Sequence, residues 1–377
     1  MVGVKGQRTC DGESLITQPN QNPFEPAATA NPASNGQRYL ESLYAESRQA
    51  YTFHHDYPGG FKSWSAEARP VLQQLLGLDN MAQDTADHQP SVRLGEPEDR
   101  NDYSLQLGYI ATAPNIHLPF WLLRPQGQPG PFPLAILPHG HDRQGHNSYA
   151  GVYQDESHRQ QSLAMERDVA GQAVRHGVVA IAPATRGLSL AANYVPDTFD
   201  RHGNRDCRSY LIHAILAGRT AVGERVWDMM RLIDWASDLP EVTTEALLMM
   251  GNSGGGVVTM YTAACDQRIA MAVPSCSFSV IANPQGRIYH CDCCAVPGIL
   301  RWGQLYDVCG LIAPRRLLAV NGIKDQLHSK TEIARSAERV GTIFDAAGVP
   351  DHFQHRWGSE DHRFYSELMW PIIMPTI

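Results

Sequence analysis

The chain has 377 residues, of which 43% are hydrophobic and 19% charged, a balance typical of a globular protein with a sizeable core. Its 31 basic and 39 acidic residues give a formal net charge of −8, so no basic excess exists to neutralise nucleic acid or an anionic membrane. No apolar run approaches the roughly 20 residues that span a bilayer, and residues 1–22 lack the apolar core of a signal peptide, which favours a cytoplasmic protein.

Residues 1–35 are rich in Asn, Gln, Pro and Ala and predict an extended or poorly ordered arm. Residues 36–90 predict an N-terminal helical extension, because apolar residues recur there at helical spacing. These residues are Leu40, Leu43 and Tyr44 in the first helix, and Trp64, Ala68, Val71, Leu72 and Leu75 in the second. We expect residues 91–377 to form one catalytic domain, which begins with β structure over 91–124.

From residue 132 the pattern alternates between short apolar strands and amphipathic helices. Strands are expected at 134–137, 178–182, 246–250, 269–273, 316–320 and 353–357. Helices are expected at 163–176, 226–236, 257–265 and from 330, where Ser329 and Glu332 form a capping box. This alternation predicts an α/β fold, with a mostly parallel central sheet covered by helices on both faces. Functional groups should then gather at the carboxyl ends of the strands.

The segment Gly251-Asn252-Ser253-Gly254-Gly255 reads G-x-S-x-G between a predicted strand and a predicted helix. That context predicts a nucleophile elbow, a sharp turn that presents the serine at its apex. Glycines suit the flanking positions, because side chains there would collide with the neighbouring strand and helix.

A serine nucleophile needs a base to take its proton and an acid to orient that base, in the chain order Ser, Asp or Glu, His. Asp325 follows the strand at 316–320 and His362 follows the strand at 353–357, so both are expected at carboxyl ends of strands. The alternatives fit less well. Glu360 and Asp361 lie too close to His362 in the sequence to orient it, and His328 follows the wrong strand. His352 and His355 lie at or within the last strand rather than beyond it.

Acyl transfer also requires donors for the developing oxyanion. One should be the backbone N–H of Gly254, directly after the serine, and the second should come from the loop after an early strand. That loop is Pro138-His139-Gly140-His141-Asp142, and we expect the backbone N–H of His141 to be the donor.

Two long connections, 188–222 and 277–311, are candidates for a lid or a binding loop. Among their aromatic residues, Tyr210, Trp302 and Tyr306 are candidate substrate contacts, with Tyr194 and Phe199 as further aromatics. The second connection also carries His290, Cys291, Cys293 and Cys294. Because no second ligand pair has clean spacing, buried reduced thiols are expected, with a metal site or a local disulfide as alternatives.

Together these motifs resemble those of the α/β-hydrolase superfamily, in particular its dienelactone-hydrolase-like and acetyl-xylan-esterase-like branch. The resemblance covers about residues 90–377. It rests on the segments 137–141, 184–187, 227–228, 251–256, 312–318, 321–325 and 361–362. It implies a carboxylic ester hydrolase with Ser253, Asp325 and His362 as triad and with His141 and Gly254 as backbone oxyanion donors. The chain departs from the family in having Ala184 and Thr185, and no aspartate, before Arg186-Gly187.

The predicted activity is hydrolysis of small acyl or acetyl esters, with carbohydrate esters among the candidate substrates, without a metal or an organic cofactor. The expected partner is a small-molecule ester, and the oligomeric state stays open. Three other functions remain open. They are a serine peptidase or amidase on the same fold, a catalytically silent binding protein, and a metal-dependent protein that uses His290, Cys291, Cys293 and Cys294.

Overall fold

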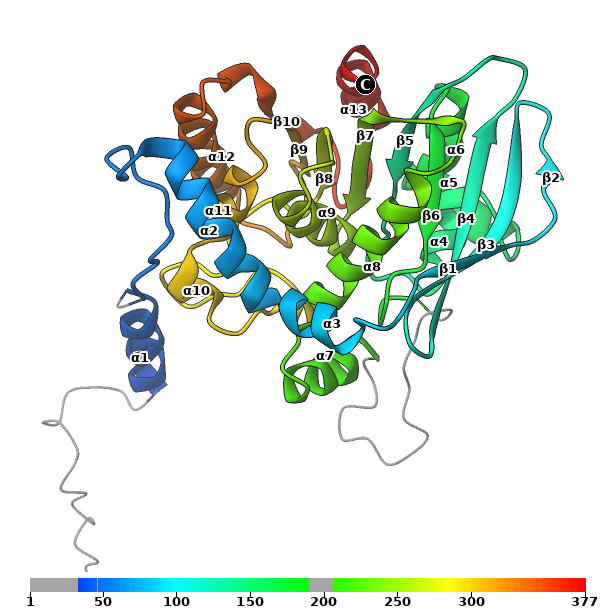
Figure 1. Ribbon diagram of the computed structural model, residues 1–377. Helices are drawn as coiled ribbons and strands as arrows, with labels where there is room; N and C mark the ends of the chain where they lie inside the picture. Colours follow the sequence, from blue (N-terminus) through cyan, green and yellow to red (C-terminus); the bar gives the residue numbers. More distant parts are fainter. Residues whose placement is uncertain (1–32, 46, 190–205) are drawn as a thin grey trace, which may run out of the picture.

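A single mixed β-sheet forms the centre of the computed structural model, which describes residues 33–45, 47–189 and 206–377 (Figure 1). The strands run in the spatial order β1-β3-β4-β6-β5-β7-β8-β9-β10, and β2 pairs with β3 at one side. Their bounds are β1 Ser91–Leu94, β2 Glu98–Asp99, β3 Tyr103–Ala113, β4 Ile116–Pro125, β5 Phe132–Ile136, β6 Val179–Pro183, β7 Val242–Asn252, β8 Met271–Ser275, β9 Arg316–Gly322 and β10 Phe353–Gly358.

The sheet is parallel from β6 through β5 and on to β10, whereas β1, β3 and β4 add antiparallel strands at one end. The strands β6, β8 and β9 are almost entirely buried, and β5 and β7 are buried toward their carboxyl ends, as expected for strands covered on both faces. The predicted α/β class with a mostly parallel sheet is therefore confirmed.

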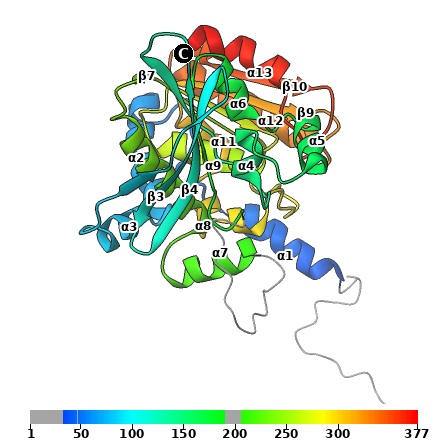
Figure 2. The same ribbon diagram turned by 90° about the vertical axis from the view of Figure 1, so that its right-hand side faces the viewer.

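Helices cover both faces of the sheet, as the views in Figures 1 and 2 show. One face carries α2 Gly60–Leu76, α3 Leu78–Asp84, α8 Ala221–Ala236, α9 Gly254–Cys265, α11 Leu305–Gly310 and α12 Lys330–Ala346. The other carries α4 Gly145–Ala150, α5 Glu156–Ala164, α6 Val169–Arg175 and α13 Ser366–Ile373. The remaining helices are α1 Ala33–Ala45, α7 Asp206–Leu216, α10 Ile299–Trp302 and the short 3-10 turns η2 Asp292–Cys294, η3 Pro350–His352 and η4 Met374–Thr376.

One local prediction was wrong, and one helix was missed. The single helix expected at 163–176 is split, because α5 ends at Ala164 and Glu166 takes a positive φ of 52° before α6 begins. The helix α13 was not predicted, since Pro371 lies inside it and proline disfavours a helix interior. The helix over α1 was predicted, but Leu40 and Leu43 are 36% and 48% exposed. Most of the expected arm at 1–35 lies outside the described residues.

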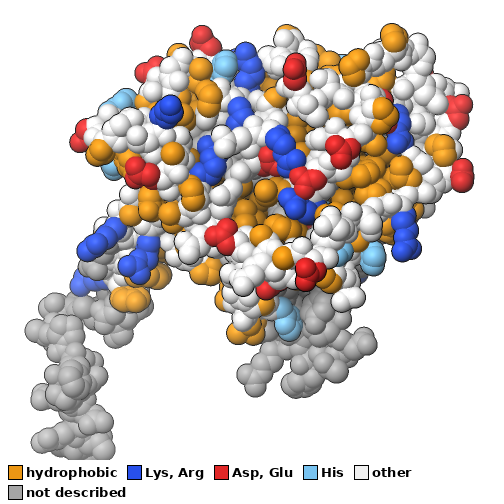
Figure 3. All heavy atoms as spheres, in the orientation of Figure 1, with side chains coloured by type: hydrophobic (Ala, Val, Ile, Leu, Met, Phe, Trp, Pro, Cys, Tyr) orange, Lys and Arg blue, Asp and Glu red, His pale blue; other side chains and the backbone are white. Residues whose placement is uncertain are grey.

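Charged side chains of both signs are interspersed on the face shown in Figure 3. Among the described residues, the helices are all too short or too polar to cross a membrane.

A buried ion pair network fastens the chain after β6 to helix α8. Arg186 donates from Nε to Asp228 Oδ2 at 2.7 Å and from Nη1 to Glu224 Oε2 at 3.1 Å. The hydroxyl of Thr112 on β3 donates to Asp228 Oδ1 at 2.5 Å. The Arg186, Glu224 and Asp228 side chains are 6%, 8% and 1% exposed, so each charge depends on its partners for the hydrogen bonds that water would otherwise supply.

We expect Arg186→Met to lower the free energy of unfolding by about 3–5 kcal/mol, because it leaves the buried carboxylate of Asp228 without its ion-pair partner, while Glu224 keeps its pair with Arg219. Urea unfolding measures the loss. The matched control is Arg100→Ala, which breaks an exposed pair with Glu98 and should cost less than about 1 kcal/mol. Equal losses in the two variants would show that the buried network does not contribute as described. Arg186→Met combined with Asp228→Leu should recover part of the loss.

Candidate active site

Ser253 occupies a sharp turn between the last residue of β7 and the first residue of α9. Its φ of 57° and ψ of −123° lie in a region that non-glycine residues rarely adopt. The backbone N–H of Ser253 donates to the carbonyl of Ser275 on β8 at 2.9 Å, which holds the turn against the neighbouring strand. The half-buried serine therefore sits in the strand, turn and helix context that the sequence predicted for an elbow.

Asp325 and His362 lie side by side beyond the carboxyl ends of β9 and β10. His362 Nδ1 is 2.7 Å from Asp325 Oδ2, and the Asp325 side chain is 4% exposed. Burial alone would raise the pKa of the Asp325 carboxyl, but hydrogen bonds from His362 and from the backbone N–H of Leu327 hold it below its usual value. Asp325 is thus an ionised acceptor, which favours the tautomer of His362 with its proton on Nδ1 and leaves Nε2 free to act as a base.

The other candidate acids and bases have different surroundings. Glu360 pairs with Lys324 at 2.8 Å, and Asp361 is exposed. His355 Nε2 contacts Asn321 Oδ1 at 3.1 Å, and His352 Nδ1 contacts the Pro314 carbonyl at 2.6 Å. Burial is the main reason that the pKa of His328 falls to about 4, so that imidazole stays neutral. Among these candidates, the structure joins only Asp325 to His362.

Several hydrogen bonds position the loop of His362, and they come from residues that the sequence does not mark as functional. Ser275 links this loop to the elbow, because its carbonyl accepts from Ser253 and its hydroxyl donates to the Arg363 carbonyl at 3.1 Å. Glu166, at the corner between α5 and α6, accepts from the backbone N–H of Ser366 at 2.7 Å and also pairs with Arg363. No motif marked either residue, since each acts through tertiary contacts.

The loop after β5 packs directly on the elbow. A Cβ atom built on Gly140 would lie 2.7 Å from the Asn252 carbonyl oxygen and 3.0 Å from the Gly254 nitrogen, closer than real Cβ atoms normally approach backbone. A Cβ on Gly254 would in turn meet His141 Nδ1 at 3.3 Å. The two predicted oxyanion donors, His141 and Gly254, therefore belong to segments in close contact.

Thr185, which stands where the resemblance leads us to expect an aspartate, holds this loop in place. Its backbone N–H donates to His139 Nε2 at 3.0 Å and its hydroxyl donates to the His139 carbonyl at 3.1 Å. His139 Nδ1 then carries the proton and donates to the Gly140 carbonyl at 2.7 Å. Burial, with a smaller effect from His146, lowers the pKa of His139 to about 3, which keeps the ring neutral.

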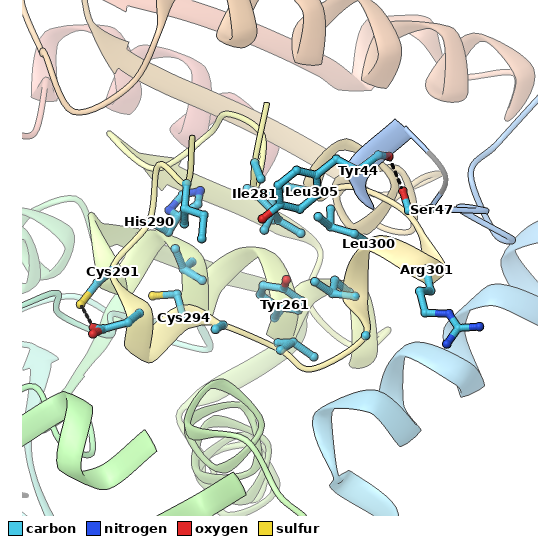
Figure 4. Close-up of a pocket in the computed structure, with 18 of the residues that line it drawn as sticks. Tyr44, Ser47, Tyr261, Ile281, His290, Cys291, Cys294, Leu300, Arg301 and Leu305 are labelled. Atoms are coloured by element: carbon cyan, nitrogen blue, oxygen red, sulfur yellow. Dashed lines mark hydrogen bonds between the residues drawn. The ribbon is translucent and has the colours of Figure 1, made fainter. Parts of the chain in front are cut away.

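Two cavities lie near these groups. One cavity of about 320 Å³ is bounded by the loop of His141 and by Leu188. Leu188 lies against the elbow, because its Cδ1 atom is 3.2 Å from the position that a Cβ on Gly254 would take. Its polar lining includes Asp142, Arg143 and Asp206. The other, about 670 Å³ and mostly apolar, follows α9 from Val257 and lies between α1 and the 277–311 connection (Figure 4). The lining of neither cavity includes a predicted triad residue, but Leu188 and His141 of the smaller cavity lie against Gly254 of the elbow.

The aromatic side chains expected to contact substrate have structural partners. Trp302 is 2% exposed and donates to the Ala68 carbonyl at 3.0 Å, so we assign it to packing rather than to substrate contact. Tyr306 is 4% exposed and lies under the guanidinium of Arg339. The Tyr210 hydroxyl accepts from Arg186 at 3.3 Å. The remaining two aromatics, at 194 and 199, lie outside the described residues.

Cys291, Cys293 and Cys294 are free thiols, as expected, and the alternative metal-binding group with His290 does not form. The ring of His290 instead lies 5.0 Å from that of His328. Cys291 and Cys293 approach His141 and Cys207, which come from two distant segments.

Comparisons with known proteins agree with this architecture. The chain is 23% identical over 294 residues to "Putative hydrolase YtaP" of Bacillus subtilis (strain 168), a match that covers 77% of this chain and 91% of that one. A solved structure described as "a putative acetyl xylan esterase" from Bacteroides fragilis superposes with a TM-score of 0.69 at 16% identity, over 90% of this chain and 94% of that one. A glucuronoyl esterase from Solibacter usitatus gives a TM-score of 0.59 at 13% identity, over 84% and 93%. No protein-family model matches the chain. These likenesses show that the chain shares the fold of these esterase structures.

We expect Gly140→Ala to destabilise the protein by about 1–3 kcal/mol, because the new methyl group overpacks the contact between the oxyanion loop and the elbow. Gly341→Ala is the matched control, since a Cβ there meets nothing within 4 Å and the substitution in a helix should stabilise by about 0.5–1 kcal/mol. Denaturant unfolding compares the two variants. A Gly140→Ala protein as stable as the wild type would contradict the close packing.

Proposed function

We propose that the protein is a serine hydrolase of carboxylic esters, with Ser253 as nucleophile, His362 as base and Asp325 as the acid that orients the base. The observation that carries the proposal is the hydrogen bond of 2.7 Å between Asp325 and His362. The loop of His362 is in turn hydrogen-bonded to Ser275, which also contacts the strained turn of Ser253. Such an arrangement suits nucleophilic acyl transfer, in which a weak alcohol nucleophile is activated by an oriented base.

In the proposed reaction, His362 Nε2 takes the proton of Ser253 as the serine oxygen bonds to the ester carbonyl carbon. Negative charge then develops on the carbonyl oxygen, and the backbone N–H groups of Gly254 and His141 receive it. His362 returns the proton to the departing alcohol oxygen as the ester bond breaks. His362 then takes a proton from water as the water oxygen bonds to the acyl carbon, and it returns that proton to the Ser253 oxygen as the acyl-enzyme bond breaks and the carboxylic acid leaves. The ionised Asp325 stabilises the imidazolium that forms in each half of the reaction.

A small acyl group, with acetyl as the first choice, is the proposed acid part of the ester. The cavity beside the elbow measures about 320 Å³, and Leu188 and His141 line it. A carbohydrate is the proposed alcohol part, because Asp142, Arg143 and Asp206 line the same cavity and could exchange hydrogen bonds with sugar hydroxyls. The name of the putative acetyl xylan esterase structure points in the same direction, whereas a glucuronoyl ester carries its sugar in the acid part.

Ser253→Ala should reduce kcat for p-nitrophenyl acetate by at least about 10³-fold, because removal of a triad nucleophile leaves only binding and oxyanion stabilisation. Ser65→Ala, an exposed serine on α2, is the control and should keep full activity. A fluorophosphonate probe should label the wild type at Ser253, located by mass spectrometry, and should not label Ser253→Ala. Retention of most activity in a folded Ser253→Ala protein would overturn the proposal.

Asp325→Asn should lower kcat by about 10³–10⁴-fold with little change in KM, since an amide cannot hold His362 in the right tautomer or stabilise its charge. Asp361→Asn removes the exposed rival carboxylate and should leave kcat within twofold of the wild type. A panel of acetylated sugars, longer acyl esters and a peptide nitroanilide then defines the substrate. Faster cleavage of the nitroanilide than of the acetyl esters would favour an amidase instead.

A further inference from the structure

Four side chains with metal-binding atoms converge between the oxyanion loop and the two long connections. His141 follows β5, Cys207 lies in the first turn of α7, and Cys291 and Cys293 lie at η2. Each offers one ligand atom, and the four atoms all lie within 4.8 Å of one another. Figure 4 shows the loop of Cys291 at the edge of the larger cavity.

We propose that His141, Cys207, Cys291 and Cys293 bind a single zinc ion in a tetrahedral Cys₃His site. With usual zinc–sulfur and zinc–nitrogen bond lengths, two sulfurs should lie ~3.8 Å apart and a sulfur and a nitrogen ~3.6 Å apart. The Sγ atoms of Cys207 and Cys291 are 3.9 Å apart, and Cys293 Sγ is 3.4 Å from His141 Nε2. Both separations leave room for an ion in the middle.

The donor set selects among the possible ions. Three thiolates and one imidazole are soft to borderline ligands, which suit zinc and disfavour magnesium or calcium. A disulfide explains the geometry less well, because bonded sulfurs lie about 2.05 Å apart and Cys207 and Cys291 are both free thiols at 3.9 Å. Because all four ligands come from the protein, no coordination position of the zinc ion is left for water or substrate, and the ion has a structural role.

The charge next to the cluster also fits a metal–thiolate centre. Three thiolates and one Zn²⁺ sum to a net charge of −1, and binding releases the three thiol protons to solvent. Arg225 on α8 supplies the opposite charge, because its Nη1 lies 3.5 Å from Cys293 Sγ and 3.2 Å from the Cys293 carbonyl oxygen. Arg225 is 1% exposed and, among the described residues, has no carboxylate partner and an Nη2 without an acceptor. A buried guanidinium needs an anion, and the thiolates are the anion at hand.

The ion would join three segments that are far apart in the sequence. It would fasten the 188–222 and 277–311 connections to the loop after β5. Coordination through Nε2 also fixes the proton of His141 on Nδ1, the atom that lies toward Gly254. The zinc site stands on its own geometry and holds whether or not Ser253 cleaves esters.

The first test measures bound metal in the wild-type protein. The chain is purified under reductant without a histidine tag or a chelator, and elemental analysis should find one zinc per chain. Replacement of zinc by Co²⁺ should give the intense thiolate-to-cobalt charge-transfer absorption of a thiolate-rich tetrahedral site. In denaturant with a chelator, all 8 cysteines should react as free thiols.

Variants locate the ligands. Cys207→Ser and Cys291→Ser should each bind less than a tenth of the wild-type zinc and should unfold at a lower temperature. Cys265→Ala is the control, because it also removes a buried thiol but lies outside the group; it should bind one zinc per chain. The wild-type measurements stand even if a variant fails to fold.

Three results would each overturn the site. One is a wild-type protein that binds no zinc when one equivalent is added under reductant. Another is full zinc binding by a folded Cys207→Ser protein. The third is a count of six thiols in the denatured wild type before reduction, with a bridge between Cys207 and Cys291.

Discussion

The contact between the loop after β5 and the serine elbow is the constraint on which the rest of the site depends. Gly140 lies so close to Asn252 and Gly254 that no larger residue fits without displacement of the backbone. His141 and Gly254, the proposed oxyanion donors, lie in the two segments that this contact joins. In the proposed reaction, donors held in place before the substrate binds would stabilise the developing charge without reorganisation. The strain at Ser253 is offset by the β7–α9 packing on either side.

Buried polar groups secure this contact from behind. The side chain of His139 is fully buried, and it is kept neutral so that it can accept from Thr185 and donate to Gly140. Arg186, the next residue along, enters the ion pair network with Asp228. One short segment after β6 therefore holds both the oxyanion loop and helix α8, which gives a physical reason for threonine at 185. Its hydroxyl and its N–H satisfy two groups of His139 that a buried site cannot leave unpaired.

The sequence was sufficient to predict the sheet, the elbow and the pairing of Asp325 with His362, because strand periodicity and chain order are local signals. It did not mark Ser275 or Glu166, which act only through contacts between distant segments. The break between α5 and α6 was hidden for the same reason, since Glu166 turns there to reach Arg363 and Ser366. Cys207 and His141 were likewise not expected beside Cys291, because no ligand spacing joins segments that only the fold brings together.

The order of strands along the chain bears on when the protein first becomes reactive. Ribosomes deliver residues from the N-terminus, and domains fold as units during or after synthesis. The elbow strand β7 is central in the sheet, whereas β10, which precedes His362, is its last strand and pairs with β9. A nascent chain that has exposed Ser253 therefore carries a serine without its proposed base. The proposed nucleophile stays an ordinary alcohol until β10 has paired with β9 and the loop of His362 has bonded to Ser275. Because the proposed base comes from the last strand to be synthesised, a half-folded chain would not yet be acylated at Ser253.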